Sequence, residues 1–245
     1  MSSFRTANMA RVLARAGGSF GGVTEAAVVV RGLRLAYGEF VVLDDVDLTV
    51  PAGQIVAATG VNGAGKSTLL RCVAGLHRPA GGQLSVLGAA PRDDAGFWRA
   101  VTLVADLPTW YPGLTVREHL ELVRLTHEPI EDWCLESGEL IELFGLSARA
   151  DAGPLDLSSG QRQRLSLATA FARPSRLLLL DEPEQSLDAD FRRELAGLLR
   201  DEYAAHGGTV LMATHDLGFA AAADARRVVI ANGRIAAPDL TGPGG

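Results

Sequence analysis

Short apolar runs of strand length recur along the chain and alternate with segments that have helical spacing. Residues 41–50 end in a strict alternation of apolar and polar side chains, which is typical of a strand with one buried face. We predict strands over residues 28–37, 41–50, 54–59, 83–87, 101–105, 177–181 and 209–214, and a hairpin over 228–235 that turns at Asn232-Gly233. This pattern indicates the α/β fold class.

The predicted helices begin after the strand over 54–59, and the longest helical stretch follows residue 115. A first helix over 67–76 places Leu69, Leu70, Val73 and Leu76 on or near one face. Thr115 and Glu118 have the spacing of a capping box, and residues 116–149 are predicted to be mostly helical, with breaks at Pro129 and Gly138.

Two further helices complete the pattern. Ser158 is a candidate cap for the next helix, and residues 191–203 form another. A helical block between residues 115 and 172 therefore interrupts the alternation with strands.

Composition narrows the function classes. The chain has 245 residues and a net charge of −6, which argues against a general nucleic-acid binder. Its two cysteines, Cys72 and Cys134, match no metal-binding spacing and favour thiols in a reducing compartment.

No apolar run approaches the roughly 18 residues that span a bilayer, so we expect no membrane channel or carrier. We expect residues 1–25 to be a disordered extension, or to follow a misassigned start, and 238–245 to be a flexible tail.

The most specific motif is a glycine-rich turn between a predicted strand and a predicted helix. It fits G-x-x-x-x-G-K-[ST], the phosphate-binding loop of many nucleotide hydrolases. Glycines let backbone N–H groups point inward, and the following helix presents its positive end to phosphate. Lys66 can reach the β- and γ-phosphates, and the Ser67 hydroxyl can ligate Mg²⁺. The candidate ATP-binding residues are Gly60, Asn62, Gly63, Ala64, Gly65, Lys66, Ser67 and Thr68.

A second motif is the apolar strand 177–181, which ends in Asp181-Glu182-Pro183. Such a strand delivers carboxylates to the edge where open α/β sheets bind ligands. Asp181 is a candidate Mg²⁺ ligand through water, and Glu182 can polarise an attacking water. Taken alone, the pair is more typical of a solvated turn, but the phosphate-binding loop upstream favours the catalytic interpretation.

A third motif, Leu157-Ser158-Ser159-Gly160-Gln161, is typical of a helix N-terminus that can also bind an anion. With the other two motifs it resembles the signature of the ATP-binding cassette (ABC) ATPases, Leu-Ser-Gly-Gly-Gln, with Ser159 in place of the first glycine. The resemblance covers about residues 28–235. It implies an ABC-type P-loop ATPase core with a mixed sheet and flanking helices, an N-terminal antiparallel β region, an ATPase domain over 26–237 and a helical subdomain over about 107–172.

The resemblance also assigns roles to residues that are uninformative alone. Tyr37 matches the aromatic that stacks on adenine, although a lone tyrosine is more often part of the core. Asp188 matches the loop that communicates across the dimer, and His215 matches the switch histidine at the γ-phosphate. In this family two copies pack head to tail, so that Ser158, Ser159, Gly160 and Gln161 of one copy complete the ATP site of the other.

One position departs from the family pattern. The family has a glutamine after the strand at 101–105, where this chain has Asp106. An aspartate is shorter and charged, and we hypothesise that it still reaches the metal, through water, with added repulsion from the γ-phosphate.

The resemblance implies an ATPase that energises a membrane transporter by ATP-driven dimer closure. The implied partners are ATP with Mg²⁺, a second ABC subunit and an integral membrane subunit, which would place the chain in the cytoplasm against the inner face of the membrane. Export is favoured over import, because nothing resembles an importer's extra C-terminal domain. The alternatives are a soluble ABC ATPase acting on ribosomes or DNA, and a regulatory nucleotide-binding module without turnover.

Overall fold

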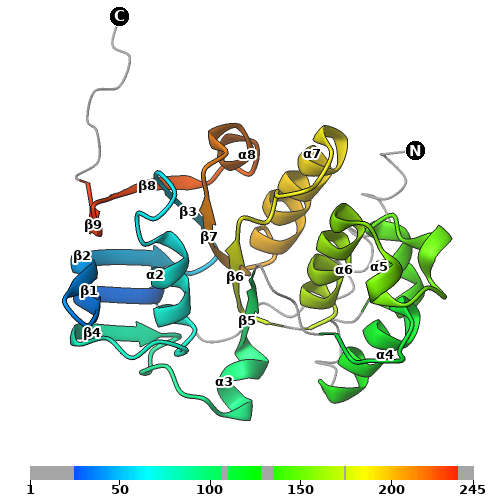
Figure 1. Ribbon diagram of the computed structural model, residues 1–245, viewed down its shortest axis with the longest axis horizontal. Helices are drawn as coiled ribbons and strands as arrows, with labels where there is room; N and C mark the ends of the chain where they lie inside the picture. Colours follow the sequence, from blue (N-terminus) through cyan, green and yellow to red (C-terminus); the bar gives the residue numbers. More distant parts are fainter. Residues whose placement is uncertain (1–24, 106–109, 128–134, 174, 237–245) are drawn as a thin grey trace, which may run out of the picture.

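The computed structural model describes residues 25–105, 110–127, 135–173 and 175–236, and two β-sheets organise them (Figure 1). The smaller sheet is antiparallel and has the order β2 (Phe40–Pro51), β1 (Ala26–Tyr37), β4 (Gly81–Val86). The larger sheet has the order β5 (Val101–Val104), β6 (Leu177–Asp181), β7 (Thr209–Thr214), β3 (Ile55–Thr59), β8 (Arg226–Ala231), β9 (Arg234–Ile235). Its strands are parallel except β9, which turns back on β8. The predicted α/β fold with a mixed sheet and an antiparallel sheet is confirmed.

The helices of the described residues cover both faces of the larger sheet. They are α2 (Lys66–Val73), α3 (Ala95–Ala100), α4 (Val116–Thr126), α5 (Ser137–Leu143), α6 (Ser159–Phe171), α7 (Ala189–Gly197) and α8 (Leu217–Ala222). Short 3₁₀ turns cover Ser147–Arg149 and Pro154–Asp156, and a π-helical segment, η3 (Leu198–Ala204), continues α7.

Strict alternation along the central strands divides the interior into two cores. In β6, Leu177 and Leu179 pack with α2 and the antiparallel sheet, whereas Leu178 and Leu180 pack with α6 and α7 on the other face. All four leucines are fully buried. Because successive side chains of a strand point to opposite faces, a continuous apolar run is what a strand covered on both faces requires.

The predicted helical block forms a group beside the larger sheet, in which α4, α5 and α6 contact one another (Figure 1). The Thr115–Glu118 capping box is present. The predicted break at Gly138 is wrong, because Gly138 lies in the first turn of α5. There Glu136 and Glu139 form a second capping box, which offsets the weak helix propensity of glycine. Pro129 lies outside the described residues.

The bounds of two predicted helices also need correction. The first helix ends at Val73, and Leu76 is 52% exposed instead of lying on the buried face, because Gly75 turns the chain with φ 74°. The helix predicted over 191–203 begins at Ala189, because the Asp188 side chain caps it, and its last turns are π-helical. The short helix α3 was not predicted.

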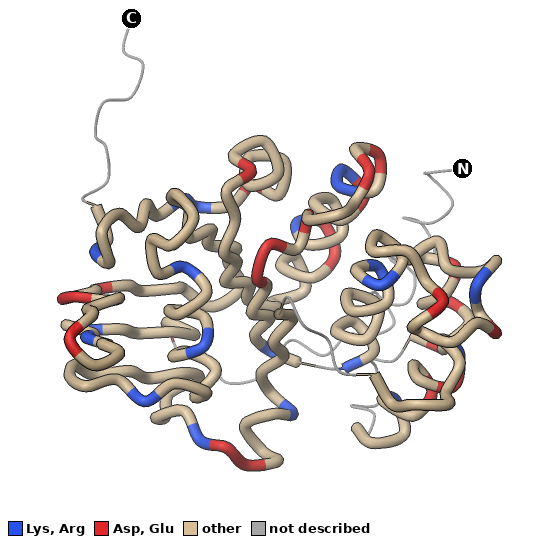
Figure 2. The backbone as a smooth tube through the Cα atoms, viewed as in Figure 1, with Lys and Arg blue, Asp and Glu red and all other residues tan. Residues whose placement is uncertain are grey.

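The hairpin at the end of the described chain follows its prediction. Asn232 and Gly233 both have positive φ, 49° and 73°, as a two-residue hairpin turn requires. The predicted tails fall almost wholly outside the described residues. Basic and acidic positions are interspersed along the described backbone (Figure 2), and no helix there is long and apolar enough to cross a membrane.

Candidate nucleotide-binding site

The loop between β3 and α2 is shaped by two glycines in backbone conformations that other residues rarely adopt. Gly60 has φ 149°, and a Cβ there would lie 2.2 Å from the carbonyl oxygen of Ile230. Gly65 has φ 105°, and its Cβ would lie 2.8 Å from a methyl carbon of Leu43. The loop therefore curls tightly against its neighbours and delivers Lys66 at the start of α2.

The N-terminus of α2 is open to an anion. Gly65 is its N-cap, so no side chain caps the first turn, and that turn carries no acidic residue. The uncapped N–H groups and the positive end of the helix dipole are the features that bind phosphate at such a terminus.

Lys66 is buried within the loop that precedes it. Its side chain is only 5% exposed, and Nζ donates hydrogen bonds to the carbonyl oxygens of Gly60 (2.9 Å) and Val61 (3.3 Å). The same ammonium lies 3.7 Å from a carboxylate oxygen of Glu182. The cation is thus held in place by internal partners that a triphosphate can replace.

Ser67 and Asp181 meet although 114 residues separate them. The Ser67 hydroxyl donates a 2.8 Å hydrogen bond to Asp181 Oδ1, and Asp181 is buried at the carboxyl end of β6. A hydroxyl and a carboxylate are hard oxygen donors of the kind that Mg²⁺ prefers. The donor set therefore fits a magnesium ion placed between this pair and a bound phosphate.

Glu182 directly follows β6 in the left-handed region, with φ 48°. Its backbone N–H donates to the carbonyl oxygen of Ala213 at the end of β7, which fixes the turn. Its carboxylate lies 2.5 Å from Nδ1 of His215, whose side chain is 60% exposed. The Glu182 carboxylate therefore lies close to both the His215 imidazole and the Lys66 ammonium at the edge of the sheet.

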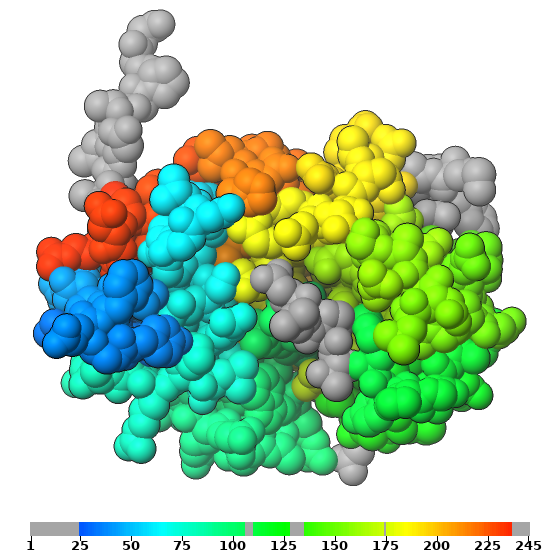
Figure 3. All heavy atoms as spheres, viewed as in Figure 1, coloured from blue at the N-terminus to red at the C-terminus, as the bar shows by residue number. Residues whose placement is uncertain are grey.

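These elements surround one cavity of about 330 Å³. Eight of the candidate site residues line it, together with Val42 and Gln185; the eight are Asn62, Gly63, Gly65, Lys66, Ser67, Thr68, Glu182 and His215. The phosphate-binding loop and the segment after β6 lie on the same face of the molecule (cyan and yellow in Figure 3). Gly60 and Ala64 shape the loop but do not line the cavity.

Other predicted residues lie outside this cavity. Tyr37, at the end of β1, is 54% exposed instead of part of the core, and its hydroxyl lies 3.1 Å from Nε2 of His77. Asp188 caps α7 and lies 2.5 Å from the Arg164 guanidinium. Hydrogen bonds from the Phe191 N–H and, less strongly, Arg164 lower the pKa of the Asp188 carboxyl. Asp106 lies outside the described residues.

The signature residues form the start of α6, away from α2 (Figure 1). The Ser158 N–H donates to the Gln161 side chain at 3.0 Å, and the Gln161 N–H donates to Ser158 Oγ at 3.2 Å. A Cβ on Gly160 would lie 2.6 Å from the carbonyl oxygen of Ser186, so the helix start packs closely on the segment after β6. Ser158 and Ser159 are exposed and belong to no described cavity of their own chain.

Sequence reasoning missed Glu184, which is buried and has a carboxylate oxygen within 4.8 Å of atoms of Glu182 and His215. It accepts a hydrogen bond from the Thr214 hydroxyl, and burial raises the pKa of its carboxyl. One of its oxygens, Oε2, has no partner among the described residues. Its position two residues after Glu182 is the only sequence signal, and spacing alone does not reveal burial.

The comparisons with known proteins agree with this geometry. The family model described as "ABC transporter" matches residues 43–185. Aliphatic sulfonates import ATP-binding protein SsuB 3 of Pseudomonas savastanoi pv. phaseolicola is 43% identical over 209 residues, covering 85% of this chain and 74% of the relative. SsuB of Pseudomonas putida is 42% identical over 212 residues, covering 86% of this chain and 75% of the relative.

Two solved structures share the fold. One, described as the ATP-binding subunit of an ABC transporter, is 30% identical with a TM-score of 0.77 and covers 86% of this chain and 88% of its own. A dimeric bacterial ABC transporter cassette is 24% identical with a TM-score of 0.73, covers 86% of this chain and 97% of its own, and supports the fold alone. The chain belongs to the ABC transporter family. Within that family it is an ATP-binding subunit, and its activity is ATP hydrolysis.

Proposed function

We propose that this chain binds Mg²⁺-ATP in the cavity between α2 and β6 and couples its hydrolysis to import across a membrane. The convergence of Lys66, Ser67, Asp181, Glu182 and His215 on one cavity carries the proposal. The two SsuB relatives are named as import ATP-binding proteins, so they favour import over the export that the sequence argument preferred.

Each residue has a role that follows from its contacts. Lys66 exchanges its carbonyl partners and Glu182 for phosphate oxygens, which stabilises the charge on the transferring phosphoryl group. Ser67 and, through water, Asp181 would hold Mg²⁺, and the bound ion would neutralise charge on the phosphates. Glu182 orients and polarises the attacking water, and His215, bonded to it, contacts the γ-phosphate.

Two copies of the chain are needed for a complete site under this proposal. The signature residues 158–161 lie outside the cavity of their own chain, with both serines exposed at a helix N-terminus that can face a phosphate. We assign them to the ATP site of a second subunit, Tyr37 to the adenine ring, Asp188 to contact between subunits and Asp106 to the metal through water. The membrane subunit then converts dimer closure into transport.

Replacing Glu182 with Gln tests the catalytic assignment. We expect ATP turnover to fall by about 10²- to 10⁴-fold with ATP binding retained, because a general base typically contributes that much. Glu142→Gln, which changes an exposed carboxylate on α5, is the matched control and should leave turnover unchanged. Equal activity of the two variants would overturn the role of Glu182. Solute movement in vesicles that contain the membrane subunit would show whether the direction is import.

A further inference from the structure

Glu184 is a buried carboxyl that lies next to the nucleotide cavity but is not among the described residues that line it. Its side chain is 2% exposed and comes two positions after Glu182 in the chain. Its neighbours Glu182 and Gln185 do line the cavity, and so does His215, which follows β7. A buried carboxyl is unfavourable unless it is paired, so the contacts of Glu184 must explain why it stands here.

One oxygen of Glu184 holds the end of the strand that leads to His215. The Thr214 hydroxyl, fully buried at the end of β7, donates a hydrogen bond to Glu184 Oε1. The same hydroxyl oxygen accepts the backbone N–H of Asp216 at 2.9 Å. Because a hydroxyl has a single proton, donation to Glu184 leaves the lone pairs of Thr214 for that N–H. Glu184 therefore helps to fix the backbone on both sides of His215.

A second contact ties the same segment to the chain that follows Glu184. Arg192 on α7 donates to the carbonyl oxygen of Leu187 at 3.0 Å, and its guanidinium lies 3.3 Å from Asp216, which caps α8. The Leu187 N–H in turn donates to the backbone carbonyl oxygen of Glu184 at 3.2 Å. The Glu184 side chain and the Arg192 guanidinium therefore hold residues 214–216 at two points.

This backbone carries the His215 imidazole. The side chain is 60% exposed, and its Nδ1 lies 2.5 Å from the Glu182 carboxylate. One polar side-chain atom of each of Glu182, Glu184 and His215 lies within 4.8 Å of the other two. A small displacement of the backbone at His215 would therefore move the imidazole away from the carboxylate to which we assign the attacking water.

Packing alone does not account for a glutamate at position 184. Its second oxygen, Oε2, has no hydrogen-bond partner among the described residues, although the side chain is buried. An unpaired buried oxygen destabilises the folded state, and an apolar side chain of similar size would avoid that loss. The glutamate is better explained by the hydrogen bond that it accepts from Thr214.

We propose that Glu184 is a positioning residue for ATP hydrolysis, which fixes through Thr214 the backbone that carries His215. It contacts neither ATP nor the attacking water and acts only through the orientation of the imidazole. This inference rests on the roles proposed above for His215 and Glu182. Under it, turnover depends on a hydrogen-bond acceptor at position 184 and not on a charge there.

ATP turnover of variants at position 184 tests this dependence. Turnover at saturating Mg²⁺-ATP is divided by the number of ATP sites found by calorimetry, so that misfolded protein does not count. We expect Glu184→Leu to lower it by about tenfold to a hundredfold, because a displaced catalytic group loses that much. Glu184→Gln keeps the acceptor and, because burial raises the pKa of Glu184, resembles the uncharged carboxyl. It should stay within about twofold of the unaltered protein.

A matched control and a second variant accompany this measurement. Glu202→Leu changes another buried carboxyl, on η3, and should leave turnover per ATP site unchanged. Thr214→Val removes the donor with little change of shape and should lower turnover by the same factor as Glu184→Leu. It takes the place of Glu184→Leu in every comparison should that variant fail to fold.

Combination with His215→Ala shows whether Glu184 acts through the imidazole. We expect His215→Ala to lower turnover and Glu184→Leu to add no further loss in that background, whereas a purely structural role would lower turnover equally in both backgrounds. A further loss of the same size, or an equal loss in Glu184→Gln and Glu184→Leu, would overturn the positioning role and leave that of His215 intact. Unchanged turnover in His215→Ala would overturn the role proposed for His215 and this inference with it.

Discussion

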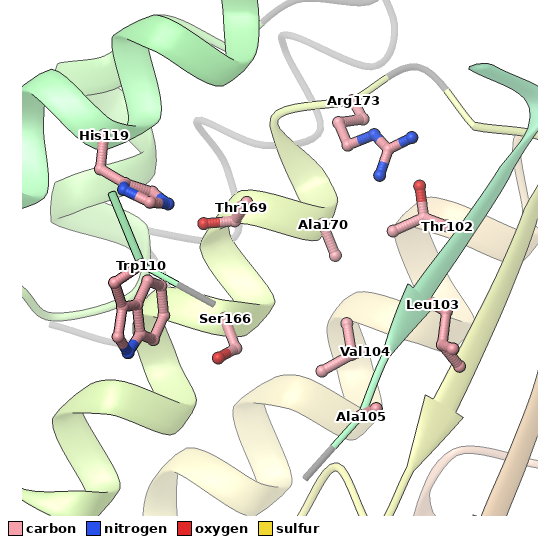
Figure 4. Close-up of a pocket in the computed structure, with 10 residues that line it drawn as sticks. All are labelled: Thr102, Leu103, Val104, Ala105, Trp110, His119, Ser166, Thr169, Ala170 and Arg173. Atoms are coloured by element: carbon pink, nitrogen blue, oxygen red, sulfur yellow. The ribbon is translucent and has the colours of Figure 1, made fainter. Parts of the chain in front are cut away.

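Two cavities of this chain differ in how their buried cations are paired. In the nucleotide cavity Lys66 is paired with two carbonyl oxygens and Glu182, and Asp181 accepts from Ser67. In a second cavity, of about 220 Å³ between β5 and the helical group, Arg173 has one carbonyl partner among the described residues, and Thr102 Oγ1 and His119 Nδ1 have none there (Figure 4). The first site can therefore stay folded while empty and exchange internal partners for ligand. The second leaves polar groups unpaired within the part of the chain that the structure describes.

The largest effect that tests this contrast is expected from Lys66→Ala. Removing the ammonium leaves the Glu182 carboxylate without its cation, so it repels the triphosphate. We expect Mg²⁺-ATP affinity to fall by about tenfold to a hundredfold, the range of a charge-assisted hydrogen bond. Calorimetry with ATP measures it, and Arg99→Gln should bind ATP normally. Unchanged affinity in Lys66→Ala would place the triphosphate elsewhere.

A second test concerns the contact that joins the helical group to the segment after β6. Gly160→Ala would place a Cβ 2.6 Å from the Ser186 carbonyl oxygen. We expect it to lower the free energy of unfolding by about 1–3 kcal/mol, as overpacking does. Urea denaturation measures this, with Gly138→Ala as the control, because a Cβ at Gly138 meets nothing within 4 Å. An equal loss of stability in Gly138→Ala would show that the contact between residue 160 and Ser186 does not cause the loss.

A third test uses pH, because burial raises the pKa of Glu184 from its ordinary value of 4.5. The folded state then holds this proton more tightly than the unfolded chain does. Stability from this group is full below pH 4.5 and is lost as the pH rises toward the folded-state pKa. The loss is about 1.4 kcal/mol per unit of pKa change.

Glu184→Gln keeps an acceptor for Thr214 and removes the ionisation. We expect its free energy of unfolding to exceed that of the unaltered protein by more at pH 8 than at pH 5. A constant difference across that range would show that the Glu184 carboxyl does not titrate differently in the folded state.

The smallest effect is expected from Thr102→Val in the absence of ligand. The Thr102 hydroxyl is buried and forms no hydrogen bond to any residue that the structure describes, so its replacement by a methyl group of similar shape loses no described contact. We expect the midpoint of urea unfolding to stay the same or rise slightly. A loss of more than about 1 kcal/mol would reveal a partner for this hydroxyl and would weaken the contrast between the cavities.

Local signals in the sequence predicted most of the fold. The Thr115–Glu118 capping box, the Asn232-Gly233 turn and the leucine run of β6 each act within a few residues, so spacing alone identifies them. Where prediction failed, a competing local contact decided the outcome. The capping box at Glu136 kept Gly138 inside a helix. The turn at Gly75 ended the helix predicted over 67–76 at Val73.

The nucleotide site was predictable for a different reason. Parallel strands end at one edge of a sheet, so the strand assignments predicted that β3 and β6 deliver Lys66 and Asp181 to the same edge, and β7 alone separates the two strands. The second cavity could not be predicted this way. Thr102, His119 and Arg173 are distant in sequence, lie on elements of different type, and share no motif. Burial of Glu184 likewise depends on packing that spacing does not encode.

The most direct test of the central claim is equilibrium binding of ATP to Glu182→Gln protein, with and without magnesium. The account predicts one ATP per chain, affinity that depends on Mg²⁺, and loss of that affinity when Asp181→Asn is added, because Asp181 and Ser67 hold the metal. Binding that is indifferent to magnesium and to Asp181 would contradict the account.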